Sequence, residues 1–495
     1  MKKNKCEVEI ATERLARKRE PAKKKFLEAG LIRARVRRFD GLLLLLVQMA
    51  FFALPVMAQS GDSMSIDNPQ TMAPSTRQSR ASLTRYLDPK NGMSADEAVA
   101  FALAHNGELL AAREEIEAAR GLIKQASLKP NPTLDIERKQ QLNGTDNDTM
   151  IGGTLPLELG GRRSARVAVV QQELELGEKL FADRERLLAA EVRAKFGEAL
   201  GHMLKLGFTE DLLSTSDRGY RLVVARVTEG RTAPLEQNMV LVEVNRIRSL
   251  REVNEGKVEV SLLELRNLIG MPSEEPLRLR GDLDHLVEPL PSLTISTELA
   301  LRDRTDLQAA RVAETLAEAR IEQARAAGRL DASVNGKYEL MNFGFPQRGF
   351  DSQGRLVPIQ GTFHSVAVGV TLDLPVRNRN QGAIEAAVAK KNAAMRRREF
   401  AELTVRRDVA SAFARYQRAA RAAEIYRVGV REQANANLDV IRQTYELGSK
   451  SLLDYISEQR RYIEVETGYI DSLLDTYAAR VEIQRATASP ELIKR

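Results

Sequence analysis

VTEGRTAPLEQNMVLVEVNR (residues 227–246) and YELGSKSLLDYISEQRRYIE (residues 445–464) begin 218 residues apart and follow one pattern. In each, a helical pattern reaches a lone glycine, Gly230 or Gly448, and resumes with a leucine and then an acid six residues after the glycine. Glycine accepts positive φ without steric cost, so it suits the end of a helix that turns back. The recurrence predicts an internal repeat in which two long helices each turn back once.

A second match supports the repeat. RTDLQAARVAETLAEARIEQARAAG (304–328) aligns with NGELLAAREEIEAARGLIKQASLKP (106–130) at a constant offset of 198 residues. Apolar residues recur every three or four positions in both, which predicts amphipathic helices. The first of these helices is expected to begin at Ser94, with Glu97 completing a capping box, and to run on unbroken until Pro130.

Between the helices, the apolar period changes to two. This alternation predicts strands at about 133–139, 150–157, 332–341 and 363–374. A strand of about 9 to 11 residues suits a tilted, membrane-spanning strand. The side chains expected to face lipid are Val334, Tyr338, Val366, Val368, Val370 and Leu372. Those expected to face a lumen are Lys337, Glu339 and Asp373, and the aromatics expected near the membrane interfaces are Tyr338, Phe343, Phe345 and Phe363, with packing among loops as the alternative.

The predicted organisation has two units of helix, strand, strand, long helix, turn and helix. The segments are a basic leader with a signal peptide (1–58), an N-terminal periplasmic segment (59–93), a first repeat (94–270), a proline-rich linker (271–293), a second repeat (294–488) and a tail (489–495). Long helices are expected at 162–227 and 381–447, and return helices at 233–270 and 451–487. The first long helix would be about 100 Å long, so it cannot be the core of a compact domain.

The N-terminal sequence indicates export. Residues 1–40 carry 14 Lys/Arg and 6 Asp/Glu, and the uncharged segment GLLLLLVQMAFFALPVMA (41–58) follows. This is the pattern of a signal peptide, and a transmembrane anchor is the alternative. The only cysteine, Cys6, lies in the leader. We therefore expect neither disulfides nor a lipid anchor in the exported chain.

Charge and composition argue against nucleic-acid binding and catalysis. Beyond residue 40 the chain has 61 Lys/Arg and 62 Asp/Glu, so the net charge of +7 comes from the leader and no basic footprint for nucleic acid remains. The four histidines match no metal-ligand spacing, and the glycine pairs at 152–153 and 160–161 do not fit a phosphate-binding loop. We predict no enzyme activity, no cofactor and no metal site.

The strand count bears on the assembly. Four strands cannot close a barrel, and an open sheet edge in lipid would leave backbone groups without hydrogen bonds. Several chains must therefore share one barrel, and three chains would supply twelve strands. The alternative is a soluble hairpin on a periplasmic coiled coil, in which the apolar face of the strands would be left exposed.

The order of elements and several motifs resemble the TolC-like outer membrane factors, the exit ducts of tripartite efflux pumps and type I secretion. The motifs are LKPNPTLDIE before the first strand, TLPLELGGRRSARV after the second and the two tips quoted above, and the resemblance extends from residue 94 to about 488. KPNP, LELGGRR and YELGSKSLLDYISEQRR are most similar to the heavy-metal branch of the cobalt-zinc-cadmium and copper-silver type. The chain lacks the lipidated cysteine of many members of that branch.

The resemblance implies a mainly helical chain with a small transmembrane β part. It implies a homotrimer that forms a twelve-stranded barrel in the outer membrane of a Gram-negative bacterium and a helical barrel in the periplasm. Such a trimer is a passive duct for substrates delivered by a periplasmic adaptor and an inner-membrane pump, here of the resistance-nodulation-division type, with heavy-metal cations as the expected cargo. A drug or type I secretion duct of the same fold stays open, as does a soluble periplasmic scaffold.

The resemblance also implies roles for residues at the tips. Gate links would join Tyr445 and Lys450 of the second tip to Glu236 of the first. Asp454 falls on an acidic ring, and Ser457 stands where an inner ring acid is often found. Residues expected to form the tip turns and to contact the adaptor are Gly230, Gly448, Leu235 and Leu453. The alternative is that Lys450 and Glu236 are solvated charges, because an exposed pair contributes under about 1 kcal/mol.

Overall fold

The computed structural model describes residues 83–283 and 292–493. These residues belong to one structural unit, Pro74–Arg495. The predicted leader and signal peptide (1–58), most of the segment 59–93, residues 284–291 of the predicted linker and the last two residues of the tail lie outside the described residues.

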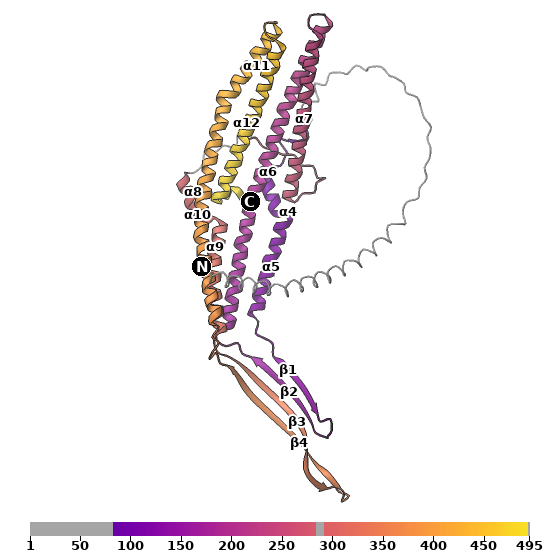
Figure 1. Ribbon diagram of the computed structural model, residues 1–495, viewed down its shortest axis with the longest axis vertical. Coiled ribbons are helices and arrows are strands. Elements are labelled where there is room, and N and C mark those ends of the chain that lie inside the picture. The colour runs from indigo at the N-terminus through magenta and orange to yellow at the C-terminus, as the bar shows by residue number, and fades with distance from the viewer. Residues whose placement is uncertain (1–82, 284–291, 494–495) are drawn as a thin grey trace, which may run out of the picture. The chain divides into compact units, whose positions relative to one another are not determined.

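The first half of the described chain contains α3 (Leu83–Tyr86), α4 (Ala95–His105), α5 (Gly107–Ser127), β1 (Thr133–Gln140), β2 (Asn147–Pro156), α6 (Arg162–Thr228) and α7 (Pro234–Ile269). The second half contains α8 (Leu293–Asp303), α9 (Thr305–Ala327), β3 (Asp331–Phe350), β4 (Leu356–Asp373), α10 (Gln381–Ile425), the π-helix η1 (Tyr426–Val430), α11 (Arg431–Glu446), α12 (Leu452–Thr487) and the 3₁₀-helix η2 (Pro490–Ile493). The strands gather at one end of the long helices, and the two helical tips lie at the other (Figure 1).

The helical region after Ser94 is two helices, which corrects the expectation of a single one. The capping box of Ser94 and Glu97 is present at the start of α4. Asn106 then takes an extended backbone conformation, its Oδ1 accepts a hydrogen bond from the Leu109 N–H at 3.0 Å, and its Nδ2 donates to the Leu268 carbonyl at 2.9 Å. Asparagine is a favoured N-cap, so Asn106 ends α4, starts α5 and ties both to α7.

The second long helix is also interrupted, whereas the sequence predicted an unbroken helix over 381–447. The π-helix η1 separates α10 from α11. Opposite η1 in α12 lies Gly468, where a Cβ would stand 2.8 Å from the Tyr426 hydroxyl oxygen. Directly after η1, Arg431 forms a 2.7 Å ion pair with Glu466, a side chain only 6% exposed. The first long helix, α6, has no such interruption over its 67 residues.

The four strands form one antiparallel sheet in the order β1-β2-β3-β4, so β2 and β3 join the two halves. Residues paired across strands share a face. The register pairs Leu155 with Val334, Val334 with Val370, and Tyr338 with Val366. One face is thereby apolar across all four strands, with exposed side chains at Leu134, Ile136, Ile151, Leu155, Tyr338, Val366, Val368, Val370 and Leu372.

The second hairpin is longer than the alternation indicated. β3 and β4 continue beyond the end of β2 to Phe350 and Leu356, instead of being confined to about 332–341 and 363–374. In this register Phe343 and Phe363 lie on the face of Lys337, because Phe363 pairs with Met341. Tyr338 lies on the opposite face. Tyr338 therefore does not share a face with Phe343 and Phe363, and the position of these aromatics near the membrane interfaces stays a prediction.

The main core lies between α4, α6, α7 and α12, where Phe196, Met203 and Leu206 are almost completely buried. Burying such a side chain stabilises the fold by about 1.5–3 kcal/mol. The segment 271–283, which was expected to be a linker, belongs to this core: Leu279 is fully buried and forms β-bridges with Leu87 and Met93. None of the helices in the described ranges has an apolar stretch long enough to cross a bilayer.

Candidate functional site

The two tips end their first helix with the same backbone motif. Gly230 and Gly448 have φ of 72° and 76°. In the first tip the Gly230 N–H donates to the Val227 carbonyl and the Arg231 N–H to the Arg226 carbonyl. The same two bonds recur 218 residues later, at Gly448 and Ser449. Both are Schellman motifs, in which a left-handed glycine satisfies the last carbonyls of the helix.

The return helices begin differently. Ser451 caps α12: its hydroxyl accepts from the Asp454 N–H at 3.2 Å, and the Asp454 carboxylate accepts from the Ser451 N–H and hydroxyl. The first tip has Ala233 at the same position and Pro234 at the first helical residue, with no side-chain cap. Glu236 and Asp454 occupy the same third position of their helices, but only Asp454 is held by a cap.

The free carboxylate of Glu236 reaches the other tip. The Tyr445 hydroxyl donates to Glu236 Oε2 at 3.3 Å, across 209 residues of sequence. Burial, and then the negative charge of Glu236, raise the pKa of the Tyr445 phenol to about 12. The ring of Tyr445 also stacks on Tyr455 of α12, with centroids 5.8 Å apart and planes within 8°. The expected pair of Tyr445 and Glu236 is thus in contact within one chain.

The other expected gate residues are placed differently. In the described part of the chain, the Lys450 ammonium has no carboxylate within 4.0 Å, so it is not joined to Glu236 within one protomer. Asp454 is exposed, and its hydrogen bonds from Ser451 hold the pKa of its carboxyl below the usual range. Ser457 is exposed and donates to the Asp454 carbonyl at 2.8 Å. Asp454 therefore has a structural role as a cap, beside the ring role implied by the resemblance.

A buried ionic link between the two hairpins was not anticipated. Glu243 of α7 is 3% exposed and accepts from Arg246 of its own helix at 2.6 Å and from Arg460 of α12 at 2.9 Å. Burial alone would raise the pKa of the Glu243 carboxyl, but the two guanidinium groups outweigh burial and lower it. Glu243 is thus ionised at neutral pH and holds α7 against α12.

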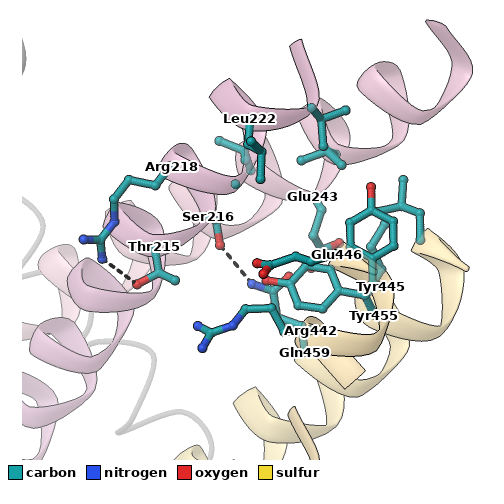
Figure 2. Close-up of a pocket in the computed structure, with 16 residues that line it drawn as sticks. Thr215, Ser216, Arg218, Leu222, Glu243, Arg442, Tyr445, Glu446, Tyr455 and Gln459 are labelled. Atoms are coloured by element: carbon teal, nitrogen blue, oxygen red, sulfur yellow. Dashed lines mark hydrogen bonds between the residues drawn. The ribbon is translucent and has the colours of Figure 1, made fainter. Parts of the chain in front are cut away.

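A second polar contact crosses the same boundary. Gln459 of α12 donates to the Ser216 hydroxyl of α6 at 2.9 Å, and both side chains are buried (Figure 2). Beside this bond lies a cavity of about 390 Å³ between α6, α7, α11 and α12. Tyr445 and Tyr455 line it from one hairpin, and Leu222 lines it from the other (Figure 2). The tip hairpins are therefore joined by these polar bonds and by buried apolar side chains, such as Val244 and Ile456, that surround the cavity.

The sequence does hold a signal for part of this link. The buried residues of α12 include Leu452, Ile456 and Ile463, and Gln459 falls on the same stripe. A polar residue at a core position of a helix predicts a buried hydrogen bond, because an unpaired polar group there would be costly. Arg460 is exposed and carries no such signal, so only the structure reveals its pairing with Glu243.

Both tips present an apolar side chain to solvent. Leu235 and Leu453 occupy the second position of their return helices and are 67% and 63% exposed. Exposed leucines at matching positions would be covered if a partner received the tips. No three His, Cys, Asp or Glu side chains come together as metal ligands anywhere in residues 83–283 and 292–493.

The described chain combines two long helical hairpins with matching tips and a four-stranded sheet that exposes one apolar face. The family model described as outer membrane efflux protein matches residues 99–271 and 297–489. The chain belongs to the outer membrane efflux protein family. It is an outer membrane channel protein, and proteins of this family act as passive ducts, not as enzymes.

Individual relatives agree with this family. The cobalt-zinc-cadmium resistance protein CzcC of Cupriavidus metallidurans is 23% identical over 397 residues, which are 79% of this chain and 89% of that protein. The outer membrane protein OprJ of Pseudomonas aeruginosa is 26% identical over 421 residues, 78% of this chain and 82% of that protein. A crystal structure of CusC has the same fold, with a TM-score of 0.66 at 18% identity, covering 79% of this chain and 91% of that one.

Proposed function

We propose that three copies of this chain form an exit duct of a tripartite efflux system that exports heavy-metal cations. The observation that carries the duct is the sheet, which has one apolar face across four strands and leaves β1 and β4 as edges. In lipid those edges need partners, because unpaired backbone groups cost several kcal/mol each. Pairing β4 of one copy with β1 of the next supplies them, and three copies give twelve strands.

The proposed lipid-facing residues follow from the register. Val334, Tyr338, Val366, Val368, Val370 and Leu372 lie on the apolar face. Lys337, Glu339 and Asp373 lie on the other face, which we assign to the lumen. This assignment is supported by the alternation on every strand, since only one face of a barrel wall contacts hydrocarbon.

The gate is proposed at the tips. Tyr445 and Glu236 would hold the tips of each protomer together, and Lys450 would complete the link by reaching an acid of a neighbouring copy. Bonds of this kind contribute about 0.5–1.5 kcal/mol each, which is enough to bias two packings of the tips that differ by a few kcal/mol. Three copies of Asp454 around the opening would form the acidic ring, while their capping bonds keep them ionised.

Heavy-metal cations are proposed as cargo because CzcC is named for cobalt-zinc-cadmium resistance and the tip and strand motifs resemble the heavy-metal branch. A periplasmic adaptor, received at Leu235 and Leu453, and an inner-membrane pump of the resistance-nodulation-division type would complete the system. A duct for drugs or secreted proteins would have the same fold. Deletion of the gene separates these cargoes: we expect sensitivity to cobalt, zinc, cadmium, copper or silver, and sensitivity to drugs alone would overturn the metal assignment.

The duct and the gate have separate tests. Detergent extraction of the outer membrane should yield a trimer, whereas a monomer in the soluble periplasmic fraction would refute the duct. In planar bilayers, Glu236→Ala combined with Lys450→Ala should raise the conductance of the closed channel, and Asp454→Ala should weaken its preference for cations. Unchanged conductance in the first variant would refute the gate, and unchanged selectivity in the second would refute the ring.

A further inference from the structure

Each of the four junctions between the sheet and the helices carries basic side chains. The junctions are residues 124–130, 157–166, 322–331 and 373–381, which we call the junction belt. The basic side chains are Lys124 and Lys129 in the first, Arg162, Arg163 and Arg166 in the second, Arg325 and Arg329 in the third, and Arg377 and Arg379 in the fourth. These segments are far apart in sequence, so their shared composition calls for a physical reason.

The junctions lie together in space, where the sheet meets α5, α6, α9 and α10 (Figure 1). Arg163 donates to the Ser127 carbonyl at 2.6 Å, which joins the first junction to the second. Arg329 donates to the Gly160 carbonyl at 3.0 Å, which joins the second to the third. The third and fourth pack so tightly that a Cβ on Gly328 would overlap the Arg379 carbonyl.

The belt has more positive charge than its own acids neutralise. It holds nine Lys/Arg and four Asp/Glu, a net charge of +5 per chain. Three of the acids are already paired within the belt: Glu158 with Arg166 at 2.6 Å, Asp331 with Arg162 at 3.0 Å, and Glu322 with Arg325. The fourth is Asp373. In the described part of the chain, Lys124, Lys129 and Arg377 are exposed and form no ion pair.

The opposite end of the sheet has no such excess. The segments around the two strand turns, residues 137–148 and 339–356, hold four Lys/Arg and five Asp/Glu, a net charge of −1. Hydrogen bonds to carbonyls of the junctions account for Arg162, Arg163, Arg166 and Arg329, but they do not account for the exposed Lys129 and Arg377. The charge is concentrated at the end that faces the helices.

The apolar face of the sheet ends at the belt. The alternation of apolar residues continues past the end of β4 to Leu374 and Val376, which are 63% and 71% exposed, and Arg377 follows directly. Leu128 stands beside Lys129, and Leu330 beside Arg329, both leucines being exposed. A band of exposed apolar side chains bordered by Lys and Arg is the composition of a surface at the boundary of hydrocarbon and headgroups.

We propose that the junction belt binds the phosphate groups of anionic glycerophospholipids in the leaflet that faces the helices. This inference rests on the proposed insertion of the sheet in a membrane. Lys and Arg attract anionic headgroups within about a Debye length, so the attraction falls as salt is added. The bound lipids would fix how deeply the helical end of the sheet lies in the membrane. The strands β1 and β2 are too short to fix this depth through their length alone.

The test uses the full-length protein and vesicles of phosphatidylcholine with or without phosphatidylglycerol. Lys129→Gln combined with Arg377→Gln removes two exposed cations that form no ion pair in the described structure, so the fold should be kept. The protein is extracted with its annular lipid, and the ratio of phosphatidylglycerol to phosphatidylcholine is measured. We expect the lipid extracted with the wild type to be enriched in phosphatidylglycerol relative to the vesicle. The enrichment should be at least about fivefold smaller with the variant.

The matched control is Arg138→Gln combined with Arg348→Gln, which removes two exposed arginines from the other end of the sheet. The control should retain the wild-type enrichment. Equal lipid ratios in the belt variant and the wild type would overturn the inference, as would a changed conductance without a changed lipid ratio, because the cations would then line the lumen. If the wild type inserts in neither kind of vesicle, the proposed membrane function is overturned instead.

Discussion

The turn from α6 to α7 and the turn from α11 to α12 have the same backbone hydrogen bonds, yet the acid that follows each turn acts differently. Asp454 closes a capping box with Ser451 and stays on its own helix. Glu236, at the matching position, faces Ala233 instead of a serine and bonds to Tyr445 of the other hairpin. We infer that the side chain at the N-cap decides whether the acid stabilises its own helix or links two hairpins.

The two halves also differ along their length. α6 is continuous from the sheet to the first tip, whereas η1 interrupts the helix that leads to the second tip. π-Helical segments are rare, and they often occur at functional sites. We therefore expect the second hairpin to be the more mobile of the two when the tips separate, with the first hairpin as the fixed wall.

The largest effect is expected in the sheet. The hairpin of β3 and β4 has one part that is paired with β2 and a second part that extends beyond β2. Val368→Arg places a charge on the apolar face and should cost about 2–4 kcal/mol if the residue lies at the bilayer midplane. Leu356→Arg, at the far end of the same strand, should cost about 0–1 kcal/mol. Trimer yield and heat stability in detergent measure both. Equal loss in the two variants would contradict the placement of Val368 at the bilayer midplane, and no loss from Val368→Arg would contradict its assignment to the lipid-facing side.

A smaller effect is expected at the buried link between the hairpins. Glu243→Ala removes both ion pairs of a buried acid but leaves two arginines that water can reach, so we expect a loss of about 1–3 kcal/mol. The matching residue of the second tip is Arg461, which is 69% exposed. Arg461→Ala should cost less than about 0.5 kcal/mol. Hydrogen exchange of the amides in α12 reports the two losses, and a larger effect from Arg461 would contradict this comparison.

One substitution gives the first tip the N-cap residue of the second tip. Ala233→Ser gives the first tip the serine of the second and should draw Glu236 into a capping box, which contributes about 0.5–2 kcal/mol to α7. The bond from Tyr445 should then be lost and the closed channel should conduct more. Ala233→Gly is the control, because it alters the backbone without offering a hydroxyl. Slower amide exchange in α7 with unchanged conductance would mean that the Tyr445 link does not hold the gate.

The smallest effect concerns pH. The pKa of Tyr445 is raised to about 12 in the folded tip, above the usual value of 10. The contribution that we propose for it to closure should therefore be complete below pH 10 and be lost as pH rises toward 12. Closure should not depend on this phenol at neutral pH. Ultraviolet absorbance follows the ionisation of the tyrosines as pH rises. In Tyr445→Phe, one phenol fewer should ionise near pH 12, and Tyr477, whose pKa is also raised to about 12, is the internal reference. If the phenol that is missing in Tyr445→Phe is instead one that ionises near pH 10, the buried contact of Tyr445 with Glu236 is contradicted.

Much of the fold could be read from repetition and periodicity. The recurrence of glycine and acid at a spacing of 218 residues placed both tips, and the alternation around Val366 and Val368 placed the apolar face of β4. The break at Asn106 has a local signal, because asparagine is a favoured N-cap, but the apolar period continues across it and hides the break. The π-helix has no such local signal, and it lies beside Gly468 of α12. Leucines in the proline-rich segment were expected in a linker, but Leu279 is in the core.

The sequence by itself determined the two tip turns and the two faces of the sheet, because each depends on local preferences: positive φ at glycine, and a side-chain period of two or about 3.6. The class of protein came from the resemblance of its motifs to a known family. Only the tertiary structure decided which residues join the tips. Glu243 and Arg460 are 217 residues apart, and Tyr445 reaches Glu236 across 209. Such pairs are set by how two hairpins pack, and no local preference of the chain encodes that distance.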